Sequence, residues 1–177
     1  SGGISAMYAS LARRLFESVD QNAALVVLND LRDKLTERVP SIEEVKALFP
    51  QILYTDSITK QKHLVKYILS GLDRAAKTGL NIDYESMTIE HLAPQSLIKT
   101  GTFAENVIGQ MGNLILVSQE LNSKLGDKTF KEKKRILLAA GYPLAADIAS
   151  ATEWTPELVS LRTHSMADTA FNKVWKI

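Results

Sequence analysis

Apolar residues recur at helical spacing over most of this chain. Leucines follow one another every three or four residues from Leu25 to Leu35, and the segment from Ile58 to Ala76 repeats that spacing. Such spacing places the apolar side chains on one face of a helix. Two short runs differ, because Met87–Ile89 and Leu114–Val117 are compact, apolar and typical of strands. We therefore expect a mainly α-helical domain that contains a two-stranded hairpin with a long connection.

Helix ends are indicated by capping residues. Ser41 stands three residues before Glu44, as in a capping box, and Pro50 closes that short segment. Thr155 before Pro156 is typical of a helix N-terminus. Gly79 and Asn81 predict a turn. Helices are predicted over residues 5–38 (as one or two helices), 42–49, 57–77, a short segment around 122, about 127–140, 144–149, and from 156 nearly to the end.

The composition limits the chemistry that is open to the chain. It has 177 residues and no cysteine, so disulfides and thiolate zinc sites are excluded. A metal would need histidine, carboxylate or amide oxygen ligands, which suit Mg²⁺ or Mn²⁺, while histidine leaves room for Zn²⁺ or Ni²⁺. No apolar run is long enough to span a membrane, and we expect a cytoplasmic protein without a membrane partner. Because Met7 is not the first residue, we also expect part of a longer protein.

Charge is distributed unevenly around the middle of the chain. Residues 81–122 carry five acidic residues and one lysine, a net charge of −4. Residues 123–135 carry six basic and two acidic residues, a net charge of +4. An acidic segment that suits a cation is thus followed by a basic one that suits phosphates, although a solvated helix face explains many such lysine-rich segments equally well.

The acidic segment contains a pair of residues suited to hydrolysing a phosphodiester. That reaction needs a base to activate water and a cation to stabilise the charge that develops on the phosphate. Glu90 and His91 stand three residues before Pro94, at the end of the first predicted strand. Neighbouring side chains of a strand point to opposite faces, but at a strand end both can approach one site. Alone, the Glu-His pair is a weak signal.

The wider pattern is more specific. Asn113 opens the second predicted strand, and Asn122 follows nine positions later in a predicted helix. This order resembles the HNH, or His-Me finger, nuclease motif, in which an acidic residue and a histidine close one strand, and Asn-Leu opens the next. A histidine or asparagine then follows on a helix. Many HNH motifs have aspartate where this chain has Glu90. Without cysteine the finger would be held by packing alone.

One branch of these nucleases matches over most of the chain from about residue 25 onward. The segments 88–95, 112–118 and 130–134 resemble the C-terminal domain of GmrSD-like restriction proteins, which cut modified DNA. Segment 66–69 and the terminal helix with Trp154, Arg162 and Trp175 are also similar to that family. The resemblance implies a metal-dependent DNA endonuclease of a phage-defence restriction system, following an N-terminal nucleotide-hydrolysing, modification-sensing domain. It implies that segment 1–80 is helical scaffold, 81–140 the ββα-metal finger, and 141–177 packing helices.

The same resemblance implies a role for each candidate site residue. His91 would be the general base. Glu90 and Asn122 would bind a divalent metal, most simply Mg²⁺ or Mn²⁺, and Asn113 would hold the active-site loop or the His91 ring in place. Contacts to nucleic acid are expected from three further residues: Gln95, Lys124 and Lys133.

Two other functions stay open on the sequence alone. One is a non-catalytic helical module with a degenerate finger that binds DNA or a partner protein. The other is an RNase or toxin-type nuclease on the same finger, because the finger contacts the backbone rather than base edges. His63 and His164 are interpreted as surface or structural residues, and Trp154 and Trp175 as core residues.

Overall fold

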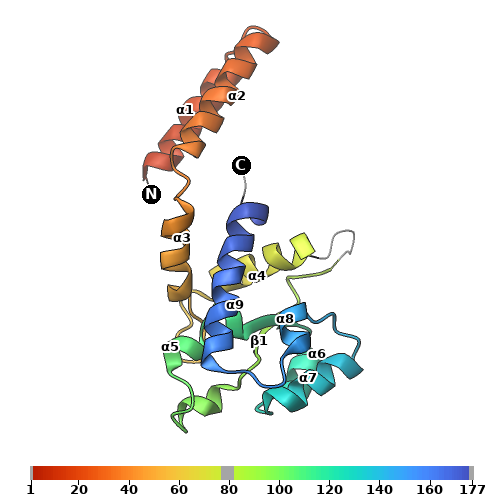
Figure 1. Cartoon of the computed structure of the whole chain (residues 1–177). Coiled ribbons are helices and arrows are strands. Elements are labelled where there is room, and N and C mark those ends of the chain that lie inside the picture. The colour runs from red at the N-terminus through yellow and green to blue at the C-terminus, as the bar shows by residue number, and fades with distance from the viewer. Residues whose placement is uncertain (1, 77–81, 176–177) are drawn as a thin grey trace. The chain divides into compact units, whose positions relative to one another are not determined.

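The computed structural model describes residues 2–76 and 82–175, and helices make up most of this part of the chain (Figure 1). This confirms the mainly helical prediction; Lys77, Gly79 and Asn81 lie outside the described residues. Short 3₁₀ turns η1 (Phe49–Gln51), η2 (Gln95–Ile98) and η3 (Met111–Asn113) and a π-helical turn η4 (Ala170–Val174) join the elements. The α-helices are α1 (Gly2–Phe16), α2 (Gln21–Thr36), α3 (Ile42–Leu48), α4 (Lys62–Ala76), α5 (Glu105–Ile108), α6 (Gln119–Leu125), α7 (Phe130–Ala139), α8 (Ala146–Ser150) and α9 (Pro156–Thr169).

The chain divides into two compact units between Ser41 and Ile42. In the first unit α1 packs against α2, and Asp20 caps α2 by accepting a hydrogen bond from the backbone N–H of Ala23 at 2.8 Å. Most large apolar side chains of this helix pair are exposed, and none of the leucines of the predicted stripe from Leu25 to Leu35 is fully buried. Two helices alone do not enclose a core, so helical spacing did not predict burial here.

The second unit contains the two predicted strands. β1 (Thr88–His91) pairs antiparallel with β2 (Leu114–Val117), which confirms the predicted hairpin. The long predicted connection between the strands contains three short helical segments, η2, α5 and η3. Among the described residues no helix is both long enough and apolar enough to cross a membrane.

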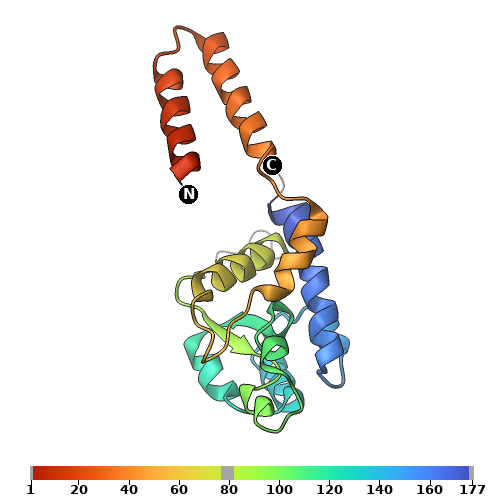
Figure 2. The ribbon, with the colours of Figure 1, turned by 90° about the vertical axis from the view of Figure 1, so that its left-hand side faces the viewer.

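The strand β2 is buried on both faces, and each face supports a separate apolar cluster. Leu114 and Leu116 belong to a cluster with residues of α4 and α9, and Figure 2 shows α4 (yellow) directly beside the strands. Ile115 and Val117 belong to the other cluster, with residues of α7, α8 and the start of α9. Because successive side chains of β2 point to opposite faces, this one strand belongs to both apolar clusters and connects them.

Three predicted helix starts were wrong by three residues or more: α1 begins at Gly2 rather than at residue 5, while α4 and α7 begin later than predicted. α4 begins at Lys62 rather than at residue 57, since the Gln61 side chain accepts a hydrogen bond from the N–H of Leu53 at 2.9 Å. α7 begins at Phe130 rather than near residue 127, because Thr129 and Glu132 form a capping box there. The Gln61 bond and the Thr129–Glu132 capping box each involve the residue that directly precedes the helix.

The last helix begins where the sequence predicts, with Thr155 as its cap. Leu161 lies on this helix with 67% of the residue exposed, whereas only 11% of the Arg162 side chain next to it is exposed. The Arg162 guanidinium donates to the carbonyls of Gly112 at 2.8 Å and Leu114 at 3.2 Å, and pairs with Asp147 at 3.1 Å. Arg162 therefore ties α9 to the start of β2.

Trp154 is buried in the core, as predicted, whereas Trp175 is partly buried and packs against the first apolar cluster. Trp154 stacks on Phe130 with ring centroids 5.1 Å apart, and Trp175 lies 6.4 Å from the Phe49 ring. His63 is exposed on α4, which confirms its interpretation as a surface residue.

Candidate functional site

A cleft of about 430 Å³ lies at the end of β1, within the second unit. Segments distant in sequence form its walls: the loop before α4, the end of β1 with the loop that follows it, and the helices α6 and α7. Five of the seven predicted site residues line this cleft, and only Asn113 and Lys124 do not. The lining residues are Asp56, Glu90, His91, Pro94, Gln95, Ser96, Lys99, Asn122, Gly126, Asp127 and Lys133.

Glu90 and His91 reach this cleft from opposite faces of the sheet. Glu90 is paired with Ile115 and His91 with Leu114, and these two partners belong to different apolar clusters. Regular alternation would separate the two side chains, but β1 ends at His91. Both therefore line one cavity although they are neighbours in a strand.

The His91 ring is held by the loop that precedes α4. Its Nε2 lies 2.9 Å from the carbonyl oxygen of Tyr54, and the two rings stack with centroids 5.9 Å apart. A carbonyl can only accept a hydrogen bond, so in this pair Nε2 carries the proton and Nδ1 is the basic nitrogen of the neutral ring. Burial lowers the pKa of His91 below its ordinary value of 6.5, which favours that neutral form at pH 7.

Glu90 is buried and paired with a lysine. The Lys133 ammonium donates to Glu90 Oε1 at 2.6 Å and to the backbone carbonyl of His91 at 2.6 Å. Burial raises the pKa of the Glu90 carboxyl, while the adjacent Lys133 charge opposes that shift. Lys133 is a predicted nucleic-acid contact, but here its ammonium bonds to the protein and only 1% of the residue is exposed.

Asn113 is fully buried behind the cleft. Its side-chain oxygen accepts from the N–H of Ala93 at 2.8 Å, and its amide nitrogen donates to the carbonyls of Ala93 at 3.0 Å and Ile108 at 2.9 Å. Its own carbonyl accepts from the N–H of Leu92 at 2.8 Å. Asn113 thus binds both ends of the connection between the strands, including the two residues that directly follow His91.

The other predicted residues differ in their surroundings. Asn122 is partly buried on α6, and its side chain forms no hydrogen bond within the described residues. Gln95 accepts from the N–H of Asp56 at 2.9 Å, so it joins two walls of the cleft. Lys124 is exposed outside the cleft and pairs with Glu120 at 2.6 Å.

Sequence reasoning missed three charged residues that line the cleft, namely Asp56, Lys99 and Asp127. Asp56 precedes β1 by 32 residues and belongs to no recognisable motif. Its position results from the loop bonds that join Tyr54 to Gly109 and Asp56 to Gln95. Lys99 and Asp127 follow the motif residues closely, and their charges were visible in the sequence.

The cleft offers few protein ligands for the divalent metal that the sequence predicts. Within residues 2–76 and 82–175, no group of three or more His, Asp or Glu side chains is arranged to hold a metal ion. Glu90 and Asn122 together offer one carboxylate and one amide oxygen. Those are hard ligands, and Mg²⁺ is commonly bound by one or two protein ligands while it keeps waters and substrate phosphate oxygens. The residues present therefore fit a metal that binds together with phosphate.

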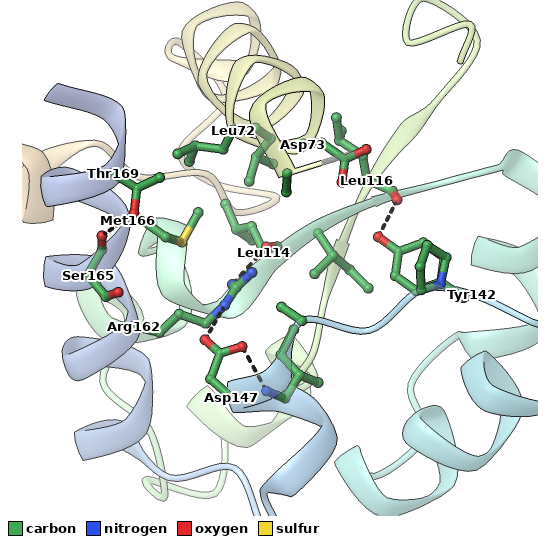
Figure 3. A pocket seen from close by; sticks show the side chains of 16 residues that line it. Leu72, Asp73, Leu114, Leu116, Tyr142, Asp147, Arg162, Ser165, Met166 and Thr169 are labelled. Atoms are coloured by element: carbon green, nitrogen blue, oxygen red, sulfur yellow. Dashed lines mark hydrogen bonds and ion pairs between the residues drawn. The ribbon is translucent and has the colours of Figure 1, made fainter. Parts of the chain in front are cut away.

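A second cavity, of about 200 Å³, lies between α4, β2, α9 and the segment from Tyr142 to Ile148 (Figure 3). It is lined by none of the predicted site residues. Arg162 bonds to Asp147 there, and the Tyr142 hydroxyl donates to the carbonyl of Leu116 at 2.9 Å. The first bond joins α8 to α9, and the second joins the segment after α7 to β2.

Comparison with known protein families gives one match. Residues 40–169 match the C-terminal domain of GmrSD restriction endonucleases. No curated protein and no solved structure matches the chain. The matched range contains the whole cleft and both strands, and it begins close to the boundary between the two units. The chain therefore belongs to the family of GmrSD restriction endonuclease C-terminal domains.

Proposed function

We propose that this chain is a metal-dependent DNA endonuclease module in which β1, β2 and α6 form an HNH-type ββα-metal finger. The observation that carries the proposal is the common cleft of Glu90, His91 and Asn122, supplied by a strand end and a helix. The family match supports DNA as the substrate, because the family is that of restriction endonucleases.

His91 is the general base of the proposed reaction. Its Nε2–H is bonded to the carbonyl of Tyr54, so Nδ1 accepts the proton of the attacking water. The lowered pKa of His91 keeps the ring neutral, and therefore able to accept that proton, at pH 7. Stacking on Tyr54 and the bonds of Asn113 to the following loop keep the ring oriented.

Glu90 and Asn122 would hold the divalent cation, Mg²⁺ or Mn²⁺, that stabilises charge on the scissile phosphate. Gln95 and Lys124 remain candidates for contacts to the nucleic-acid backbone. In a restriction system that cuts phage DNA in the cytoplasm, sensing of the modified base would belong to a nucleotide-hydrolysing domain that precedes this one.

The decisive experiment is a plasmid-nicking assay with Mg²⁺, with Mn²⁺ and with chelator. We expect cleavage with metal and none with chelator, and His91→Ala should reduce the rate by about 10²- to 10⁴-fold, the usual contribution of a general base. His63→Ala is the matched control, because that histidine is exposed and lies outside the cleft. Undiminished cutting by His91→Ala would refute the assignment, and DNA binding without any cleavage by the wild type would favour a non-catalytic module.

The ligand role of Asn122 is tested by metal titration of the same reaction. Asn122→Ala should raise the Mg²⁺ concentration at half-maximal rate by about tenfold or more, because disturbed ligation typically costs that much affinity. Asn106→Ala serves as the control, since Asn106 is exposed on α5 and outside the cleft. An unchanged titration curve for Asn122→Ala would remove this residue from the ligand set.

A further inference from the structure

Lys133 has an environment that is unusual for a lysine. It lies on α7 with 1% of its surface exposed, and its ammonium donates two hydrogen bonds of 2.6 Å, to Glu90 Oε1 and to the carbonyl of His91. Lysine is seldom fully buried unless it is paired. The bond to the backbone means that Lys133 does more than neutralise one carboxylate.

Local sequence holds this lysine in place. Thr129 and Glu132 form a capping box that sets where α7 begins. Phe130 and Leu137, three residues before and four residues after Lys133, are both buried on the same face of the helix. The ammonium is therefore carried by a helix whose start and apolar face are both fixed.

The two acceptors of Lys133 belong to consecutive residues of the proposed catalytic pair. Regular strand geometry directs the Glu90 and His91 side chains to opposite faces of the sheet, so it does not by itself bring both to one site. Lys133 bonds to the side chain of one and to the backbone of the other. One carboxylate oxygen of Glu90 and the end of β1 are thereby held by the same group.

We propose that Lys133 is a positioning residue that sets Glu90 and the His91 backbone in the cleft and does not contact DNA. The inference rests on the proposed function and adds a role that the motif residues do not supply. Its ammonium is buried with two oxygen partners, whereas 61% of the Lys124 side chain is exposed on α6. Lys133 therefore acts through the two residues that it binds.

The absence of cysteine from the chain allows a direct test. Lys133→Cys, alkylated while unfolded with 2-bromoethylamine and then refolded, restores an ammonium on a side chain of nearly the length of lysine. Alkylation with 1-bromopropane gives an uncharged side chain of the same length. Lys131→Cys, treated in the same two ways, is the control, because Lys131 is exposed on the same helix.

The proposal predicts a defined pattern in nicking and DNA binding. The propyl form should lose about 10²-fold in kcat, as misplaced catalytic groups do, and the aminoethyl form should recover it to within about threefold. DNA affinity and its salt dependence should be equal in both forms. A phosphate contact would instead lower the slope of log affinity against log salt by about 1 in the propyl form. That result, or equal kcat for the two forms, would overturn the proposal.

A second readout does not need cleavage. Ring ¹⁵N chemical shifts of His91 at pH 8 should show the single Nε2–H tautomer in the wild type and the aminoethyl form, and a mixture in the propyl form.

If the propyl form does not fold, Glu90→Gln is compared with Glu90→Gln/Lys133→Met, in which the buried charges are removed together. A mixed tautomer only in the double variant supports the proposal, and identical spectra refute it. Wild type that does not cleave would refute the proposed function, while the spectra would still decide the role of Lys133.

Discussion

Asn113 shows how one buried amide can organise a site that it does not enter. Its side-chain oxygen accepts one hydrogen bond and its amide nitrogen donates two, all with the backbone of Ala93 and Ile108. None of its surface is exposed. Both N–H groups of the side-chain amide are donated to backbone carbonyls, and neither a carboxylate nor an apolar side chain has such donors. The loop after His91 is thus bonded to the residue that opens β2.

We expect Asn113→Ala to destabilise the fold strongly. The substitution leaves the N–H of Ala93 and two carbonyls without partners in the interior, and a buried unsatisfied group costs about 1–3 kcal/mol. The free energy of unfolding, measured by urea denaturation, should fall by about 3 kcal/mol or more. The exposed Asn106→Ala should leave it nearly unchanged. Equal denaturation midpoints for the two variants would show that Asn113 is not structurally important.

The Glu90–Lys133 pair should show the asymmetry that is typical of buried ion pairs. Lys133→Met leaves the Glu90 carboxylate buried and unpaired, which costs about 3–5 kcal/mol of unfolding free energy. Glu90→Leu/Lys133→Met removes both charges and should recover most of this loss, as apolar replacements of buried pairs do. Both values come from chemical denaturation. A double variant as unstable as the single one would show that the pair itself stabilises the fold.

The residues of the cleft were predictable to different degrees. Glu90, His91 and Asn122 follow from the order of the motif, and they line one cleft. The burial of Lys133 could have been read from its spacing with Phe130 and Leu137, which places it on the core face of α7. The general preference of lysine for exposed positions points the other way, so the spacing alone did not lead to that prediction.

At the scale of elements, the prediction was accurate where local pattern determines structure. The strands were found because each is a compact apolar run, and α9 because Thr155 and Pro156 mark its start. The start of α4 depends on bonds between Leu53 and Gln61, and the position of Tyr54 on a bond to Gly109. Such bonds join segments whose partners no local pattern identifies.

The packing of η3 against α9 requires a glycine at position 112. A Cβ atom there would lie 2.0 Å from the carbonyl oxygen of Val159 and 2.8 Å from the backbone nitrogen of Thr163. Both are backbone atoms of a helix and cannot move aside singly. The Gly112 N–H also donates to Thr163 Oγ1 at 2.9 Å.

We therefore expect Gly112→Ala to displace η3 from α9 and to disturb the start of β2. The loss of stability should exceed the 1–3 kcal/mol typical of overpacking, because the contacts are to backbone. Gly3→Ala is the control, because a Cβ atom at that helical position would meet no other atom within 4 Å. Thermal denaturation should show a large decrease only for Gly112→Ala, and similar transitions for both variants would contradict this account of the contact.

At the scale of the whole chain, the parts needed for the proposed chemistry lie in the second unit. Both apolar clusters, the two strands and every residue that lines the cleft come from Ile42 onward. The family match covers residues 40–169 and so excludes nearly all of the first unit. The sequence predicts three segments, 1–80, 81–140 and 141–177, whose limits differ from the boundary between the two units. That division remains a prediction.

A chain of residues 40–177 should consequently fold and keep the activity of the full chain. The first unit adds no residue to either cluster, so its removal should leave the thermal transition of the second unit in place. The nicking rate, Mg²⁺ dependence and sensitivity to His91→Ala should match those of residues 1–177. A deletion that also removes Ile42 to Phe49 is the contrasting variant, because Val45 and Phe49 belong to the first cluster, and it should unfold. Loss of cooperative folding in the 40–177 chain would show that the second unit needs the first for its stability.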